Sequence, residues 1–374
     1  MAPYRCWAEI STRQIVDNFN AVRRVTGAGV ETMPVVKADA YHHGAVETSR
    51  ALVAAGARWL AVSNVEEGAE LRDAGIDARI LVMAGVLSQE WDEVAGRSLT
   101  PVLQSLEDIE TAEQLALRGG RRLRYHLKVD TGLGRLGTRA EPERILAAVA
   151  QAPHAELEGL MTHLASAADF AGAQSVEQLS LFDALVQRLA EGGLAPRYLH
   201  AASSSAIAYG RRGGWKNMVR PGLSLYGYVS PSSGEPPERL LSVEPALTWK
   251  AAVLEVKDVP AGATVGYNAL FRASRPMRVA VLAAGYADGY PHQLGNRSRV
   301  IIQGRYAALL GAVSMDLLTV DATQCPRLKP GDAVTLLGAE GEARVDAAEL
   351  ARGAGTIPYT VLCGIAARVK KVYV

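Results

Sequence analysis

The chain has 374 residues, a length typical of about two domains. Hydrophobic residues make up 49% of it and charged residues 21%, an ordinary globular composition that argues against disorder. The 40 Lys and Arg residues against 39 Asp and Glu residues give a formal net charge of +1, so the overall charge makes no case for a nucleic-acid or anionic-membrane partner.

The N-terminal stretch and the cysteines bear on the compartment of the protein. Charged residues such as Arg5 and Glu9 interrupt the first fourteen residues, so no signal peptide is predicted. No stretch reaches the roughly 18–20 uninterrupted apolar residues that a membrane span needs. Cys6, Cys325 and Cys363 are far apart and odd in number, which predicts neither a disulfide framework nor a metal site. We therefore expect a reduced, cytoplasmic protein.

Short apolar runs typical of buried strands recur through the first two thirds of the chain. They lie at 33–38, 59–64, 78–84, 100–105, 124–130, 157–164, 197–203 and 218–227. Helical patterning separates them, most clearly at 174–191 and also at 44–56 and 65–75. About eight strand–helix units in succession predict an α/β domain, a (β/α)8 barrel of the TIM type over residues 1–240. An open, doubly wound sheet is the alternative.

The last third of the chain has a different character. From about residue 245 it is rich in strand patterns separated by turn signals, and only 346–354 is predicted as a short helix. This pattern predicts a β-rich C-terminal domain over residues 241–374. The segment 230–241, rich in Pro, Ser and Gly, is the expected linker.

Lys37 ends the first apolar run, and catalytic groups of a barrel follow the carboxyl ends of its strands. Burial at that point would disfavour the charged form of the lysine and lower its pKa. An uncharged amine can attack a carbonyl and form a Schiff base. The plainer interpretation is a lysine whose head group reaches solvent at the barrel rim.

The fifth apolar run also ends in polar residues. His126, Lys128 and Asp130 alternate along it and therefore share one face of the strand, and Arg135 follows in the next loop. This crowding indicates a functional site. A buried Lys–Asp pair that holds a loop is the alternative.

Polar residues also end the sixth, seventh and eighth runs. His163 lies near the end of the sixth, His200 and Ser204 at the end of the seventh, and Arg220 and Gly222 in the eighth. A histidine on a strand is often only a core residue, and a serine before a helix is often only its N-cap. However, many barrels hold a phosphate after strands seven and eight. A lysine after strand one, with a phosphate site opposite, indicates pyridoxal phosphate as the cofactor.

The motifs resemble those of the alanine racemase family. VVKADAYHHG resembles its pyridoxal-phosphate lysine motif, and further segments match in order: HLKVDTGLGRLG, GLMTHLASA, HAASSSA, NMVRPGLSLYG, VGYN, AAGYADGYP, AVSMD and TIPYTVL. The resemblance covers residues 4–374. It implies a fold type III pyridoxal-phosphate barrel, a β domain, and head-to-tail homodimers with active sites at the interface. It also implies interconversion of L- and D-alanine, with D-alanine supplied for peptidoglycan.

The resemblance implies individual roles as well. Lys37 matches the Schiff-base lysine, which is also one catalytic base, and Tyr267 matches the second base, which the partner subunit supplies. Arg220 matches the arginine that faces the pyridine nitrogen. Arg135 and the backbone N–H of Met315 match the groups that hold the substrate carboxylate.

The remaining matches surround these residues. The expected phosphate contacts are Tyr41, Ser204, Gly222, Leu223 and Tyr359. His163 and His200 match residues that support the cofactor. Asp316 matches a residue that supports the site, and Tyr286 matches a tyrosine at its entrance. Lys128 matches a lysine that the family often carries as a carbamate, a covalent modification that the sequence does not record.

The chemistry of racemisation agrees with this set. A Cα proton must leave one face and return to the other, so each face needs a base. Arg220 would leave the pyridine nitrogen unprotonated, because an arginine stays cationic. An amino-acid decarboxylase of the same fold type is a weaker alternative, since in those families an acidic residue faces that nitrogen. A non-catalytic pyridoxal-phosphate carrier is weaker too, because it needs neither the β domain nor Tyr267.

Four positions depart from the family pattern. His42, Leu164 and Thr360 stand where glycine, phenylalanine and glutamate are usual, and they touch loop packing. Ala312 stands where the family usually has an arginine in the wall of the substrate corridor. A racemase that also accepts serine or larger amino acids is therefore the alternative to one that prefers alanine strongly.

Overall fold

In a computed structural model, residues 2, 4–236 and 238–374 are described; Pro237 of the expected linker lies outside them. The chain forms two compact units. The barrel unit comprises 15–40 and 45–244, and the β unit comprises the residues up to Gln14, 41–44 and 245–374. The sequence predicted one domain boundary, at 240/241. In the structure the β unit also includes two segments from the N-terminal part of the chain, the residues up to Gln14 and 41–44.

Parallel strands form the centre of the barrel unit. Six of them pair in chain order, β3 (Trp59–Val62), β4 (Arg79–Val82), β5 (Thr100–Leu103), β6 (Leu123–Lys128), β7 (Ala155–Met161) and β8 (Tyr198–His200). β2 (Glu31–Thr32) pairs in parallel with β9 (Met218–Val219). Bridges from Val35 to Ala61 and from Ser203 to Arg220 join the two sets. Within the described residues the eight strands therefore close into a ring, and the predicted barrel is confirmed.

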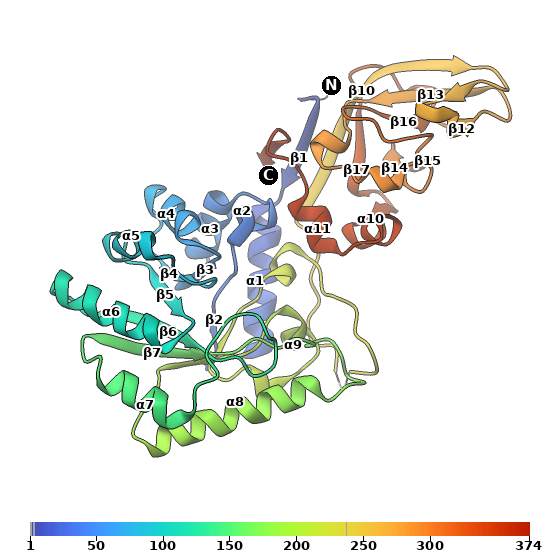
Figure 1. Ribbon diagram of the computed structural model, residues 1–374. Coiled ribbons are helices and arrows are strands. Elements are labelled where there is room, and N and C mark those ends of the chain that lie inside the picture. Colours follow the sequence, from blue (N-terminus) through green and yellow to red (C-terminus); the bar gives the residue numbers. More distant parts are fainter. Residues whose placement is uncertain (1, 3, 237) are drawn as a thin grey trace. The chain divides into compact units, whose positions relative to one another are not determined.

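Helices follow the strands and lie on their outer side (Figure 1). They are α3 (Ala45–Ala54), α4 (Val65–Asp73), α5 (Trp91–Gly96), α6 (Leu106–Gly119), α7 (Pro142–Ala150), α8 (Gln174–Glu191) and α9 (Ser204–Ala208), after α1 (Thr12–Thr26). The predicted helices at 44–56, 65–75 and 174–191 correspond to α3, α4 and α8. Buried side chains such as Tyr125, Leu127 and Phe182 fill the space between helices and strands. No helix in the described part of the chain is long and apolar enough to cross a membrane.

Two predicted strands are shorter than the sequence indicated. The run 33–38 forms only the bridge at Val35, and the chain then enters the short left-handed turn α2 (Lys37–Tyr41). The run 218–227 is a strand only at Met218–Val219 and becomes the 3-10 turn η3 (Leu223–Tyr226). Pro221 lacks the N–H that a continuing strand would need, which explains the second difference.

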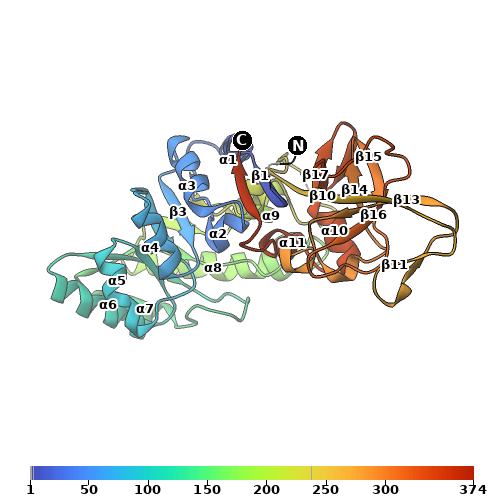
Figure 2. The same ribbon diagram turned by 90° about the horizontal axis from the view of Figure 1, so that it is seen from above.

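The β unit is built on a nine-stranded sheet. Its strands are β1 (Cys6–Ile10), β10 (Leu247–Val259), β13 (Met277–Leu282), β14 (Arg299–Ile302), β15 (Arg305–Ala308), β16 (Leu318–Asp321), β17 (Ala333–Glu340), β18 (Ala343–Val345) and β19 (Lys370–Tyr373). β1 pairs antiparallel with β10 and parallel with β19, so the two chain ends lie close together in this unit (Figure 2).

Two smaller features complete the β unit. The strands β11 (Thr264–Val265) and β12 (Phe271–Arg272) form a separate antiparallel pair. The predicted helix at 346–354 is α10 (Ala347–Ala354). The expectation of a single helix in this region is wrong, because α11 (Pro358–Cys363) follows it. Pro358 stands at the start of α11, where the missing N–H of a proline costs nothing.

Candidate active site

Lys37 lies at the carboxyl end of the barrel and begins a left-handed turn. Ala38, Asp39 and Ala40 have φ angles of 52°, 53° and 53°. Such backbone costs L-residues roughly 1–2 kcal/mol each, so contacts must hold it. The Ala40 N–H donates to Val36 O at 2.8 Å, and the Ala45 N–H donates to Asp39 Oδ1 at 2.8 Å. The backbone that carries Lys37 is thus both strained and fixed.

Glu67 provides a further anchor for this turn. Its Oε1 accepts a hydrogen bond from the Ala38 N–H at 2.7 Å, and its Oε2 accepts one from the Ser63 N–H at 2.6 Å. Asn64, the N-cap of α4, accepts a hydrogen bond from the Glu67 N–H at 3.0 Å. One carboxylate therefore joins the residue after Lys37 to the start of α4. The sequence interpretation missed Glu67, although an Asn three residues before a Glu is a helix-start signal.

Arg220 follows β9, the strand paired with β2, and only 3% of its surface is exposed. Its Nη1 donates to His200 Nδ1 at 2.6 Å, and its Nη2 donates to Thr162 O at 2.8 Å. Burial lowers the pKa of Arg220 to about 10, so the side chain remains a cation near neutral pH. Burial and the charge of Arg220 hold the pKa of His200 well below its usual range.

The donors in this cluster fix the histidine tautomers. A guanidinium can only donate, so His200 Nδ1 accepts and His200 Nε2 carries the proton. His200 Nε2 donates to His126 Nδ1 at 2.8 Å. His126 Nε2 then faces Glu158 Oε2 at 3.9 Å, and Glu158 binds Arg79 through two hydrogen bonds of 2.5 Å. A buried polar chain thus runs from Arg220 through the barrel interior. The sequence did not reveal that His126 belongs to it.

Lys128 ends β6 and is 4% exposed. Burial, together with the charges of Arg135, Arg220 and Lys37, lowers the pKa of Lys128 to about 8. Burial and the same cations lower the pKa of His163 to about 3, and its Nδ1 lies 3.3 Å from Arg220 Nη2. Four cations that follow three strands therefore act on one region, and positive charge predominates there.

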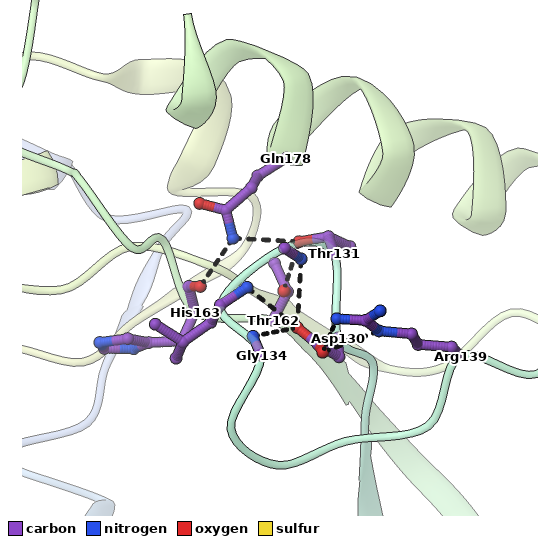
Figure 3. Close-up of polar contacts among 9 residues, drawn as sticks. Asp130, Thr131, Gly134, Arg139, Thr162, His163 and Gln178 are labelled. Atoms are coloured by element: carbon purple, nitrogen blue, oxygen red, sulfur yellow. Dashed lines mark hydrogen bonds and ion pairs between the residues drawn. The ribbon is translucent and has the colours of Figure 1, made fainter. Parts of the chain in front are cut away.

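Asp130 holds the loop after β6 (Figure 3). Its Oδ1 accepts hydrogen bonds from the Gly132 and Gly134 N–H groups at 3.1 and 3.0 Å, and its Oδ2 accepts from Arg139 Nη2 at 2.7 Å. Burial raises the pKa of Asp130, but these hydrogen bonds outweigh it and hold the pKa at about 2. The alternative of a Lys128–Asp130 pair is wrong in this detail, because the ion-pair partner of Asp130 is Arg139.

A second set of hydrogen bonds ties this loop to the neighbouring strand. Thr131 and Thr162 share a hydrogen bond of 2.8 Å between their hydroxyls. Gln178 reaches down from α8 and donates to His163 O at 3.0 Å (Figure 3). The loop that carries Arg135 and the segment after β7 that carries His163 are therefore held together by these hydrogen bonds.

Ser204 and the turn after β9 form a cradle of hydrogen-bond donors. Ser204 begins α9, and its Oγ accepts from the Gly222 and Ser224 N–H groups at 3.0 and 3.1 Å. Leu223 begins the following 3-10 turn. Backbone N–H groups and a hydroxyl at helix starts suit a phosphate. This donor set and the excess of buried cations fit pyridoxal phosphate, which is anionic.

The β unit carries the other expected phosphate contacts. The rings of Tyr41 and Tyr359 lie 5.9 Å apart, centroid to centroid. Burial, followed by the neighbouring Tyr359 and Cys363, raises the pKa of the Tyr41 phenol above its usual range. Tyr41 therefore keeps its proton, which is the form that can donate a hydrogen bond to a phosphate.

Tyr267 lies between β11 and β12, and 69% of its surface is exposed. The backbone of Gly311 packs closely on this hairpin, since a Cβ there would lie 2.5 Å from Val265 O. Asn296 joins the two segments, because it donates to Leu270 O at 2.9 Å and accepts from the Gly311 N–H at 2.6 Å. Asn296 is a second support that the sequence interpretation missed.

The segment after Ala312 carries Met315 and Asp316. Met315 is 54% exposed, and its carbonyl accepts from the Ala287 N–H at 2.9 Å. Asp316 Oδ1 accepts from Arg368 Nη2 at 2.6 Å. The Tyr286 N–H donates to Ser314 O at 3.0 Å, so the expected entrance tyrosine is tied to the same segment.

The expected site residues thus fall into two groups, each described within its own unit. The barrel unit holds Lys37, Lys128, Arg135, His163, His200, Ser204, Arg220, Gly222 and Leu223, and the β unit holds Tyr41, Tyr267, Met315 and Tyr359.

Comparisons with known proteins cover the whole chain. Residues 10–231 match the family "Alanine racemase, N-terminal domain", and 246–373 match "Alanine racemase, C-terminal domain". An alanine racemase of Carboxydothermus hydrogenoformans is 39% identical over 98% of this chain and 99% of its own.

Solved structures give the same result. That of alanine racemase from Bacillus anthracis with bound L-Ala-P has a TM-score of 0.89 and 31% identity, over 100% of this chain and 96% of the other. That from Bartonella henselae with covalently bound pyridoxal phosphate has a TM-score of 0.87 and 29% identity, over 100% of both.

Proposed function

Because this chain belongs to the alanine racemase family, we propose that it interconverts L- and D-alanine with pyridoxal phosphate as its cofactor. The observation that carries the proposal is the match of both family domains along the chain. The position of Lys37 and Arg220 after paired barrel strands supports it. The product D-alanine would serve peptidoglycan synthesis. The three cysteines, of which Cys363 is exposed, form no disulfide within the described residues, which favours a reducing, cytoplasmic compartment.

Residues of both units would hold the cofactor. Lys37 Nζ would bond to its aldehyde carbon, and Arg220 would face its ring nitrogen. Ser204, the N–H groups of Gly222 and Leu223, and the phenols of Tyr41 and Tyr359 would bind its phosphate. The cofactor, when bound, supplies an electron sink for the electron pair left at Cα.

The chain's own residues would move the proton. Lys37 Nζ takes or returns the Cα proton on one face, and the Tyr267 phenolic oxygen does so on the other. Arg135 and the Met315 N–H hold the substrate carboxylate and so fix which faces the two bases meet. Arg220 stays cationic and only donates a hydrogen bond, which leaves the ring nitrogen unprotonated. His200 and His126 keep Arg220 in place, with His163 beside it.

Lys128 is proposed to carry a carbamate. Its pKa of about 8 leaves a substantial fraction of neutral amine near neutral pH. The ammonium first loses one proton; the neutral amine then attacks the carbon of CO2, a C–N bond forms, the electron pair of one C–O double bond moves to oxygen, and a second proton leaves the nitrogen, so that overall a cation becomes an anion. That anion would offset the excess of positive charge and orient Arg135. Enzyme equilibrated with 13C-bicarbonate should show one carbamate carbon signal, and Lys128→Gln should lack it.

We also propose a homodimer with shared sites, arranged head to tail, in which each Tyr267 serves the barrel of the partner. The exposure of Tyr267 and its neighbour Leu270, 69% and 57%, is compatible with a surface that a second chain covers. The domain roles follow, with residues 1–240 binding the cofactor and 241–374 supplying the second base. Inactive Lys37→Ala and Tyr267→Phe chains, mixed, should regain part of the activity; no recovery despite subunit exchange would contradict shared sites.

A chiral assay tests the function directly. Protein loaded with pyridoxal phosphate should convert either pure enantiomer of alanine to an equal mixture. Lys37→Ala should lose this activity by more than about 10⁴-fold, because it lacks both the cofactor bond and one base. Borohydride should fix the cofactor on the peptide that contains Lys37. No conversion by well-loaded protein would contradict the proposal.

A racemase with a wider substrate range remains a second candidate. The observation behind it is Ala312, whose short side chain stands beside the Tyr267 hairpin; a Cβ on Gly266 would lie 3.2 Å from the Ala312 nitrogen. A larger residue at this position would reach further toward Tyr267.

A further inference from the structure

The barrel has a polar cavity at the opposite end from Lys37. It has a volume of about 910 Å³ and lies at the amino ends of β4, β5 and β6. Six arginines and two aspartates are among its lining residues, the arginines being Arg72, Arg79, Arg118, Arg121, Arg122 and Arg124. Four of these arginines come from the seven residues 118–124. The near-neutral overall charge conceals this local concentration.

Most of these arginines have partners. Arg72 donates to carbonyls before β4 and β5, including Ala78 O at 2.8 Å and Arg97 O at 3.0 Å. Arg79 binds Glu158, and Arg124 Nε lies 3.3 Å from Glu156 Oε2. These three arginines therefore stabilise the end of the barrel itself, and they account for only part of the positive charge.

Arg121 and Arg122 are different. Both are exposed, and no acidic side chain of the described residues forms an ion pair with either. Arg118, just before them, reaches only to Asp92, at 3.8 Å. The nearby end of α6 does not need their charge, because the Gly120 N–H already caps Ala116 O and Leu117 O. Two guanidinium groups are thus left at the cavity without a structural task.

The other wall of the cavity is apolar. Val94, Leu99, Leu115 and Leu123 line it, and each is at most 8% exposed. A volume of this size is that of a pocket for a small organic ligand, for which the usual range is about 300–1,000 Å³. A nucleic acid would need an extended basic track instead. The cavity therefore combines an apolar wall with the exposed guanidinium groups of Arg121 and Arg122.

We propose that this cavity binds a small organic molecule that has an apolar or aromatic body and two or more phosphate groups, such as a nucleoside di- or triphosphate. Arg121 and Arg122 each offer the planar fork of donors that matches a phosphate, and the leucine-lined wall receives the body. The site is separate from the one that holds pyridoxal phosphate and does not depend on the proposed function.

Calorimetric titration of the pyridoxal-phosphate-loaded enzyme tests the proposal. ATP should bind saturably with one site per chain, and AMP, adenosine and inorganic triphosphate should each bind at least about tenfold more weakly, a loss of about 1.4 kcal/mol. Arg121→Glu/Arg122→Glu should weaken ATP binding at least tenfold. Arg144→Glu/Arg352→Glu, at exposed positions outside the cavity, makes the same change in net charge and should leave ATP binding within twofold.

Several results would overturn the proposal. One is no saturable binding of ATP up to about 1 mM, a free energy of about −4 kcal/mol. If the two double variants weaken ATP binding equally, the effect comes from the net charge of the protein and not from the cavity. If inorganic triphosphate binds as tightly as ATP, the ligand needs no apolar body. If a single-stranded oligonucleotide binds but ATP does not, the ligand is a nucleic acid. Melting curves of each variant show whether it is folded.

Discussion

Lys37 and Tyr267 are held in opposite ways. Lys37 begins a strained turn whose backbone is tied to Glu67 and Asp39, and its charge acts on the buried Lys128 and on His163. Tyr267 is 69% exposed on a short hairpin that rests on one neighbouring segment. The barrel unit thus fixes the backbone at Lys37 through its own polar contacts. The β unit, in contrast, leaves most of the Tyr267 side chain exposed.

The largest expected effect of an anchor is at Glu67. Glu67→Ala removes both acceptors that hold the Ala38 and Ser63 N–H groups, so the turn that carries Lys37 should relax. We expect racemisation to fall about 10²-fold, the cost of a misplacement of about 1 Å. Glu67→Gln keeps one acceptor and should lie between. Unchanged kcat in Glu67→Ala would show that Lys37 needs no such anchor.

The buried histidines make stability depend on pH. Burial, then the charges of Arg79 and Arg220, lowers the pKa of His126 to about 3. Its usual pKa is near 6.5, so in acid the unfolded chain binds this proton first and stability falls as the pH drops from about 6.5 toward 3, at up to about 1.4 kcal/mol per pH unit. Urea unfolding at pH 7, 6 and 5 should give a shallower fall for His126→Gln. Parallel curves for the two proteins would contradict the assignment.

Asn296 should matter less for the Tyr267 hairpin than Glu67 does for the Lys37 turn, because the close packing of the Gly311 backbone also holds the hairpin. Asn296→Ala loses the hydrogen bonds to Leu270 O and the Gly311 N–H. Racemisation should fall about 5–10-fold, less than for Glu67→Ala. Asn296→Asp, which keeps the acceptor for Gly311, is the control and should retain more activity. A larger loss than at Glu67 would reverse the contrast between the two anchors.

The smallest effect concerns selectivity. Ala312→Arg restores the usual family residue beside the hairpin and should narrow the substrate corridor. The ratio of kcat/KM for serine to that for alanine should fall a few-fold, since such pockets discriminate one methylene by about 1–3 kcal/mol. An unchanged ratio would show that Ala312 does not control the substrate range.

The sequence predicted those features that depend on local patterns. Alternating apolar runs and helical stretches predicted the barrel, and motif spacing placed Lys37, Arg220 and Ser204 at strand ends, where the structure has them. The turn after Lys37 was not predictable, because Ala38 and Ala40 have no sequence signal for positive φ. Glu67, Asn296 and the link from His126 to His200 were missed for a common reason: these roles come from partners 15 to 74 residues away, brought near only by the fold.

The most direct test of the two-base account is deuterium exchange at Cα in the Tyr267→Phe variant. Racemisation should fall by about 10²–10⁴-fold, the usual contribution of a general acid–base group. Lys37 remains on its own face, so in D2O one enantiomer of alanine should still exchange its Cα proton while the other loses exchange. Equal loss of exchange for both enantiomers, in a variant that still binds the cofactor, would contradict the assignment of Tyr267 as the second base.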